Sequence, residues 1–225
     1  MTSPTAKRSG ASWRRLGGPT RRVHSHPTIG VVDLVPDVDS ASVAAAALAR
    51  HTRPEELGSQ LSRAWAQAYR SRLPQSSLLE FDSDGARFLF DLASAAGAQR
   101  ADRTVAAWGR SRPAPRPRDQ AYQRGYPSPR GRADRPLDKG HMVAHAAGGT
   151  FGPNMFPQDR ELNRGWSVAG RRYRALEREI ANTPGAFFFC CLLYGDDSDF
   201  PAAVELGVLG GDGLQVERFR NRFDL

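Results

Sequence analysis

The sequence has only two cysteines and no long apolar run, and each shortage excludes a class of protein. Cys190 and Cys191 are adjacent, and neighbouring cysteines rarely reach disulfide geometry, so neither a disulfide framework nor a four-cysteine zinc site is expected. The longest unbroken apolar stretch runs from Ala186 to Tyr194 and falls short of the roughly 20 residues that a membrane-spanning helix needs. We therefore expect a protein of a reducing compartment with no membrane partner.

A secretory signal is also missing from the sequence. The first thirty residues carry six basic residues and no acidic one, but no apolar segment follows them, and a signal peptide requires one. We therefore expect a cytoplasmic protein, or one that is delivered by a secretion route that needs no signal peptide.

Positive charge is concentrated in two segments. Residues 1–30 have 6 basic and 0 acidic residues and residues 100–136 have 10 and 3, whereas residues 31–99 have 6 and 9 and residues 137–225 have 10 and 12. Basic segments on an otherwise mildly acidic chain indicate contact with a polyanion such as nucleic acid. An alternative is that genomic base composition alone enriches arginine, since 30 of the 32 basic residues are Arg.

The pattern of the first half predicts a disordered basic tail over 1–30 and a helical accessory region over 31–109. Asp39 or Ser40 can cap a helix that reaches Arg50, and Thr52 to Glu55 reads as a capping box at the start of a second helix. A third helix is predicted from Gly85 to Ala96. The second helix carries one apolar face, formed by Leu57, Leu61, Ala64, Trp65 and Ala68.

The second half, 110–225, predicts an α+β domain. Its first part, to Pro136, alternates proline with arginine and is either a linker or an extended strap that contacts phosphates. Three strands are predicted over Ala186–Tyr194, Ala203–Leu209 and Leu214–Phe219. Before them, an apolar helical stripe that packs on another element contains Trp166, Ala169, Tyr173, Leu176 and Ile180.

An ordered set of short motifs occupies the start of this domain. The set reads Asp138-Lys139-Gly140-His141-Met142, Gly148-Gly149, Asn154-Met155-Phe156-Pro157-Gln158, Leu162-Asn163-Arg164-Gly165 and Tyr173-Arg174-Ala175-Leu176-Glu177. It resembles the DNA/RNA non-specific endonuclease family, which are ββα-metal (His-Me finger) nucleases, among them bacterial toxin and DNA-entry nucleases. The resemblance covers about residues 120–225 and does not extend to residues 1–100. It implies a ββα-metal core with an antiparallel sheet.

The resemblance also implies roles for three side chains. His141 would be the general base, because an imidazole with a pKa near 6.5 accepts a proton at neutral pH. Asn163 would be the direct ligand of Mg²⁺, which prefers oxygen and keeps several waters; it could also cap a helix. Glu177 would contact the metal or its waters, provided that a helix break over Ser167–Gly170 shortens the 14-residue spacing, which spans about 21 Å in a continuous helix. Without a break, Glu177 would be a solvated acid.

Other residues of the motif would complete the site. By resemblance, Asp138 would orient the catalytic strand or a neighbouring base, and Asn154 would hold the site by hydrogen bonds. Lys139 stands where the family usually has arginine, so phosphate attraction is kept while bidentate contact is in doubt. Weaker candidates for phosphate contact are Arg135 and Arg164.

These features together predict a Mg²⁺-dependent endonuclease, with Mn²⁺ as a substitute. It would hydrolyse DNA with little sequence specificity, because backbone contacts carry no sequence information, and RNA is left open as a second substrate. The expected setting is a bacterial toxin with an immunity protein, an antiphage-defence effector, or a general nuclease. The rival hypothesis is a catalytically silent module that binds nucleic acid through its arginine-rich segments.

Overall fold

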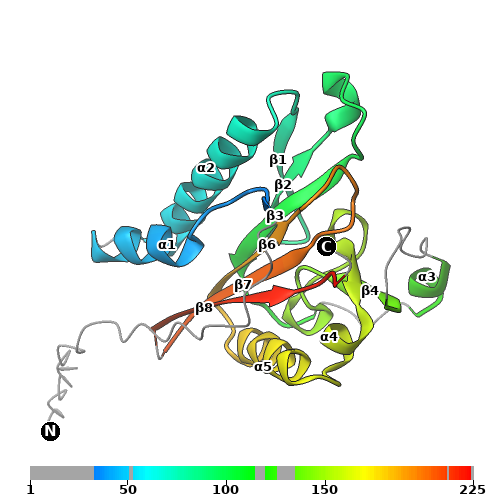
Figure 1. Cartoon of the computed structure of the whole chain (residues 1–225). Coiled ribbons are helices and arrows are strands. Elements are labelled where there is room, and N and C mark those ends of the chain that lie inside the picture. The colour runs from blue at the N-terminus through cyan, green and yellow to red at the C-terminus, as the bar shows by residue number, and fades with distance from the viewer. Residues whose placement is uncertain (1–32, 51–52, 115–119, 126–134, 212, 224–225) are drawn as a thin grey trace, which may run out of the picture.

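The computed structural model describes residues 33–50, 53–114, 120–125, 135–211 and 213–223. The predicted tail over 1–30 and most of the proline- and arginine-rich segment lie outside these ranges. The described chain has three layers, with a large sheet between two layers that contain helices (Figure 1). The predicted α+β class with an antiparallel sheet is confirmed. Within the described ranges, no helix has both the length and the apolar character that crossing a bilayer requires.

The central sheet has six strands in the order β1-β2-β3-β6-β7-β8, and every pairing is antiparallel. All of β6 is buried, because both faces of the sheet are covered. The three strands predicted for the end of the chain are therefore confirmed. The strands of this sheet are β1 (Leu78–Ser83), β2 (Ala86–Asp91), β3 (Arg103–Arg110), β6 (Phe187–Leu193), β7 (Ala203–Gly210) and β8 (Gly213–Arg220).

Helices α1 (Ser40–Ala49) and α2 (Pro54–Arg72) cover one face of the sheet (Figure 1). The predicted apolar face of α2 packs there, and Trp65 lies 5.9 Å from Trp108 and 5.5 Å from Phe189 between ring centroids. Asp39 caps α1 by accepting a hydrogen bond from the Ser42 amide at 3.0 Å. Of the two predicted capping residues, Asp39 and Ser40, the structure therefore uses Asp39. Helix α2 begins at Pro54 with Arg53 as its N-cap, and the Thr52 of the predicted capping box lies outside the described residues.

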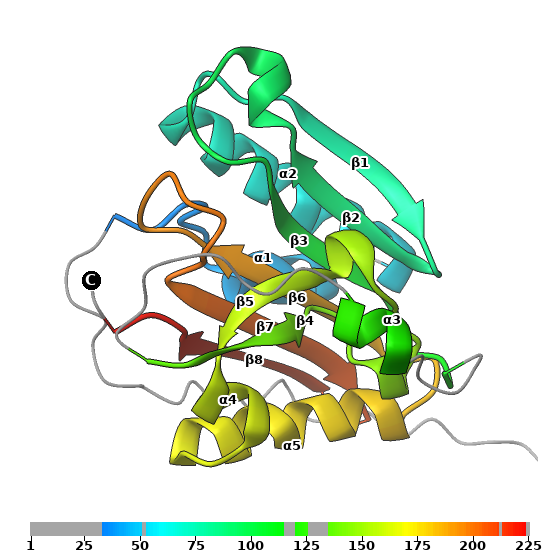
Figure 2. The same ribbon diagram turned by 90° about the vertical axis from the view of Figure 1, so that its right-hand side faces the viewer.

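The other face of the sheet is covered by a two-stranded hairpin and two helices (Figure 2). The hairpin consists of β4 (Leu137–His141) and β5 (Met155–Asp159), and the helices are α4 (Arg160–Arg164) and α5 (Val168–Asn182). The 3-10 turns η2 (His145–Ala147) and η3 (Gly152–Asn154) lie between the two strands, and the short helix α3 (Gln120–Gly125) precedes them. On α5, Tyr173 stands edge-on to Phe219 of the sheet at 5.2 Å.

The prediction of a helical accessory region over 31–109 is wrong for the second half of that region, which forms strands β1, β2 and β3. The predicted helix over Gly85–Ala96 is strand β2 followed by a 3-10 turn, η1 (Ala93–Ala96). Asp84 (φ 50°) and Gly85 (φ 75°) form the two-residue turn between β1 and β2, where a right-handed strand twist favours left-handed residues. Because β3 pairs with β6, the sheet runs through the predicted domain boundary at residue 110.

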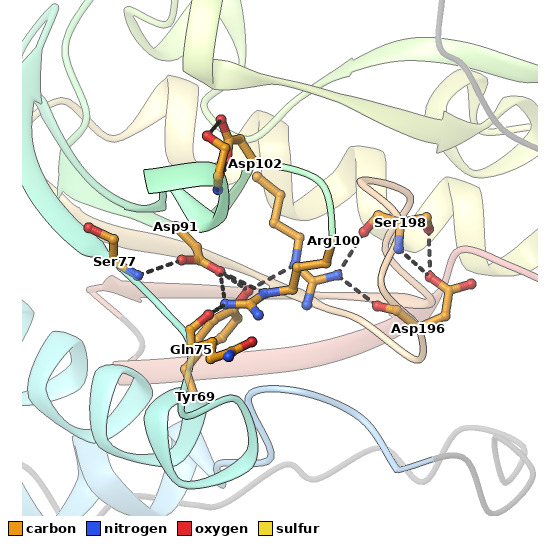
Figure 3. A network of polar contacts seen from close by, with 10 residues as sticks. Tyr69, Gln75, Ser77, Asp91, Arg100, Asp102, Asp196 and Ser198 are labelled. Carbon is orange, nitrogen blue, oxygen red and sulfur yellow. Dashed lines mark hydrogen bonds and ion pairs between the residues drawn. The ribbon is translucent and has the colours of Figure 1, made fainter. Parts of the chain in front are cut away.

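A buried polar network connects the C-terminal end of strand β2 to helix α2 (Figure 3). The Asp91 carboxylate is fully buried and accepts hydrogen bonds from the Tyr69 hydroxyl at 2.9 Å and the Ser77 amide at 3.0 Å. Arg100 donates to the same carboxylate at 2.8 and 3.0 Å. Burial raises the pKa of Tyr69 to about 12. Asp91 therefore satisfies several donors that would otherwise lack a partner away from water.

Arg103 extends this network to the loop between β6 and β7. Its guanidinium donates to the Tyr69 hydroxyl at 2.9 Å and lies 4.0 Å from the centroid of the Tyr194 ring. The same group donates at 2.7 Å to the backbone carbonyls of Asp196 and Ser198. One buried cation thus holds a helix, a strand and a loop together.

The stability of the protein should depend on pH through Glu205 of β7. This side chain is buried, its Oε2 makes no hydrogen bond within the described part of the chain, and its Oε1 lies 3.4 Å from Arg218. Burial raises the pKa of Glu205, and the attraction of Arg218 offsets only part of that effect. The folded state therefore holds this proton more tightly than the unfolded chain does, so stability falls as pH rises above the ordinary value of 4.5.

Glu205→Gln should remove this slope, because glutamine does not titrate. We expect the free energy of unfolding of the wild type, relative to the variant, to decrease steadily as pH rises from 4 through the raised pKa. Urea unfolding at a series of pH values measures this difference. A constant difference would show that folding does not perturb this carboxyl group.

Candidate active site

The predicted site residues lie on one hairpin and the two helices that follow it. Strands β4 and β5 pair antiparallel, with His141 opposite Met155 and Leu137 opposite Asp159, and the chain continues directly into α4. A hairpin followed by a helix is the order of elements that the motif predicts. The site is thus built from residues that are close in sequence, and the elements that carry it pack against one face of the six-stranded sheet.

His141 is the last residue of β4. Its side chain is 8% exposed, and its ring centroid lies 6.0 Å from that of Phe151. The residue before it is glycine, and a Cβ there would stand 2.6 Å from the Cβ of Gln158 on the paired strand, an atom that rotation of the Gln158 side chain cannot move away. The Gly-His pair of the motif therefore reflects the packing of one hairpin strand against the other.

Asn154 closes the loop that joins the two strands. Its side chain is buried, accepts a hydrogen bond from the Val143 amide at 2.8 Å and donates to the Val143 and Thr150 carbonyls at 3.0 and 2.7 Å. These bonds hold the backbone just after His141. The predicted role of Asn154 in holding the site thus has a geometric basis in three hydrogen bonds to the loop.

Asp138 joins the hairpin to α4. Its carboxylate accepts hydrogen bonds from Arg164 at 2.6 and 3.1 Å, from Arg160 at 3.0 Å and from Nδ2 of Asn163 at 3.2 Å. Burial alone would raise the pKa of Asp138, but the hydrogen bonds from these donors outweigh it and hold the pKa below its usual value. Asp138 is therefore a carboxylate that orients α4, and the sequence pattern did not predict Arg160 as one of its partners.

The bond to Asp138 also orients the Asn163 amide. An amide group has one oxygen and one nitrogen end, and a carboxylate can bind only the nitrogen end. The Nδ2 end of the Asn163 amide therefore faces Asp138, and its Oδ1 end faces away from that carboxylate. Its oxygen is thus the end left for a ligand, which matches the preference of Mg²⁺ for oxygen.

A break separates the helix that carries Asn163 from the helix that carries Glu177. Gly165 adopts left-handed geometry (φ 74°) at the end of α4, and Ser167 caps α5 by accepting from the Gly170 amide at 2.9 Å. A Cβ at Gly170 would lie 2.3 Å from the Glu161 carbonyl, so glycine allows α5 to start against the backbone of α4. The predicted break therefore exists, slightly earlier than the predicted Ser167–Gly170.

Glu177 lies under the loop that follows His141. The side chain is 8% exposed and bonds to Arg174 at 2.6 Å, so it is not a solvated acid. It lines a small cavity together with Met142, Val143 and Ala144. The break in the helix thus places this carboxylate beside the hairpin loop.

The basic residues of the motif have partners in the structure. Lys139 donates to the Arg124 carbonyl at 3.3 Å, and Arg164 binds Asp138. Arg135 pairs with Asp159 at 3.3 Å and also with Glu161, and it stacks on the Phe223 ring. Arg135 is therefore committed to ion pairs that hold β5 and α4, whereas Arg164 keeps a side chain that is 46% exposed.

The donor set of the site suits a hard cation and not a soft one. The ranges that the structure describes contain no cluster of three or more His, Cys, Asp or Glu that could hold a metal ion. The predicted ligands are one amide oxygen and one carboxylate, which fit Mg²⁺ with water in its remaining positions. Both cysteines are buried in the sheet, where burial raises the pKa of each thiol, and neither contributes to this set.

A cavity of about 540 Å³ opens on the far side of β5 from α4, and its walls include Phe81, Phe90 and Met155. It contains none of the predicted site residues. The polar groups in its walls already have partners, as in the bond from the Thr104 hydroxyl to the Pro153 carbonyl at 2.7 Å.

Neither a protein-family model nor a curated protein matches the sequence.

Proposed function

We propose that this chain is a divalent-metal-dependent endonuclease of the ββα-metal type that hydrolyses phosphodiester bonds of DNA, with RNA as a second substrate to be tested. One observation carries the proposal. His141 ends the first strand of a hairpin, and the helix after that hairpin holds Asn163 with its amide nitrogen bound to Asp138 and its oxygen available as a ligand. One hairpin and the helix after it thus carry both a base and an oxygen donor, the two groups that phosphodiester hydrolysis requires.

The chain's own residues would divide the work as follows. His141 would take the proton of the attacking water, and the Asn154 bonds would keep the backbone beside it in place. Asp138 would hold Asn163 in the correct orientation, and Glu177 would present its carboxylate beside the same loop. A Mg²⁺ ion held by Asn163, with Glu177 at or near it, would supply positive charge for the phosphate.

The proposed biological setting is a toxin or antiphage-defence effector, in which an immunity or regulatory protein would restrain the nuclease. The excess of basic residues at both ends of the predicted accessory region supports a nucleic-acid partner. The rival function, binding without cleavage, would use the same charges but would need neither His141 nor a metal.

Metal removal tests the proposal directly. The purified chain should degrade plasmid DNA in Mg²⁺ or Mn²⁺, stop in EDTA and recover when excess Mg²⁺ is added, because the donor set favours hard cations. Gel analysis of plasmid and of a matched RNA gives the rate and the substrate preference. Equal cleavage with and without chelator would contradict the metal mechanism, and DNA binding without any cleavage would favour the rival function.

A further inference from the structure

Trp166 is one of the few large apolar side chains that the described part of the chain exposes. It is 61% exposed, whereas Trp65 and Trp108 are buried. The helical stripe predicts that Trp166 packs inside the protein, and this prediction is wrong, because the residue lies in the break between α4 and α5 and not on a helix. Tryptophan is enriched at binding interfaces because its ring combines a large apolar face with a polar N–H group, so an exposed Trp166 is a candidate contact for a ligand.

The backbone around Trp166 is held firmly. Its amide donates to the Glu161 carbonyl at 3.0 Å, and its carbonyl accepts from Arg171 at 3.4 Å. Gly165 supplies the left-handed residue that turns the chain toward this position. The indole is thus presented from a fixed turn that ends α4.

Arg164 lies over one face of the indole, with its guanidinium carbon 5.0 Å from the ring centroid. Because this contact occupies one face, the large exposed fraction of Trp166 comes from the other face and the ring edge. Arg164 also binds Asp138, which binds Asn163. A continuous series of contacts therefore connects the exposed indole to the predicted metal ligand.

We propose that Trp166, backed by Arg164, is a stacking platform for an unpaired nucleobase close to the bond that is cut. The inference rests on the proposed nuclease function and specifies its substrate as single-stranded or locally melted nucleic acid. Aromatic rings with neighbouring cationic side chains bind the faces of bases regardless of sequence. In a duplex those faces are already stacked on their neighbours, so the platform would act only where a strand is open.

Binding measured in EDTA separates this inference from catalysis. The full-length chain would carry Trp13→Phe, so that Trp166 becomes the main quenchable tryptophan outside the core. A thymidine oligonucleotide should quench the fluorescence saturably, and a blunt duplex of equal length should quench it little. By anisotropy of the labelled oligonucleotide, Trp166→Ala should weaken single-strand binding about 5- to 150-fold and leave duplex binding unchanged.

Three further variants distinguish stacking from simple apolar contact. Trp166→Phe should bind within about threefold of the parent, because a ring is kept, whereas Trp166→Leu should behave like Trp166→Ala. Val168→Ala, which removes another exposed apolar side chain nearby, should bind like the parent. Parental binding by Trp166→Leu, equal losses on single and double strands, or an absence of saturable quenching would each overturn the platform. Normal stacking with no hydrolysis in Mg²⁺ would instead refute the nuclease function alone.

Discussion

His141→Ala is expected to lower the rate of DNA cleavage by about 10²- to 10⁴-fold, the usual contribution of a positioned general base. The side chain ends a strand of the hairpin, and its backbone pairing with Met155 does not depend on the imidazole. The variant should therefore stay folded and keep its affinity for nucleic acid. Single-turnover cleavage at saturating Mg²⁺, with circular dichroism as a check on folding, measures the effect.

Two substitutions serve as comparisons for this loss. His145→Ala removes a histidine four residues away, in the turn η2, that the motif does not assign to the site, and it should cleave at close to the wild-type rate. Asn163→Ala should lower activity and weaken Mg²⁺ affinity together, because it deletes the proposed ligand oxygen. If a folded His141→Ala protein cleaves at the wild-type rate, the nuclease assignment is wrong.

Asp91→Ala should lower the free energy of unfolding by about 3–5 kcal/mol, the usual cost of removing one partner from a buried ion pair. Asp91 is completely buried, and the side chain of its partner Arg100 is only 6% exposed. The substitution would deprive that cation and the hydroxyl of Tyr69 of the carboxylate acceptor that they share. Chemical unfolding followed by tryptophan fluorescence, with two buried indoles as reporters, gives the free energy.

A matched ion pair on the surface provides the control. Asp82 on β1 pairs with Arg87 at 3.2 Å, and its side chain is 72% exposed. Exposed pairs contribute about 0–1 kcal/mol, so Asp82→Ala should change stability little. Similar losses for Asp82→Ala and Asp91→Ala would mean that burial is not what makes the network around Asp91 important.

His141→Ala and Asp91→Ala test different parts of the molecule. His141 lies on the hairpin layer, whereas Asp91 lies on the far side of the structure, where β2 meets α2. We expect His141→Ala to lose cleavage while its stability is unchanged, and Asp91→Ala to lose stability. Together these results would show that the hairpin carries the chemistry and that the sheet supports it.

Local patterns in the sequence determined much of this structure. The unbroken apolar run of β6 predicts a strand covered on both faces, and the spacing of Leu57, Leu61 and Trp65 predicts the packed face of α2. Both predictions are confirmed, because burial on two faces and helical periodicity leave marks within a single segment. The motif also predicts that Asp138 and Asn163 belong to one site, and the structure joins these two side chains by a hydrogen bond, whereas the chemical roles of the motif residues remain predictions.

Only the tertiary structure decided the rest. Strand β3 contains Ala106 and Ala107, and such small residues favour a helix locally, but pairing with β2 and β6 on either side makes the segment a strand. Arg135 has acidic partners that lie more than twenty residues away in sequence, and Trp166 is exposed because α4 ends two residues before it. Strand pairing, ion-pair partners and the faces exposed at a helix break depend on which segments meet in space, and a single segment carries no record of its neighbours.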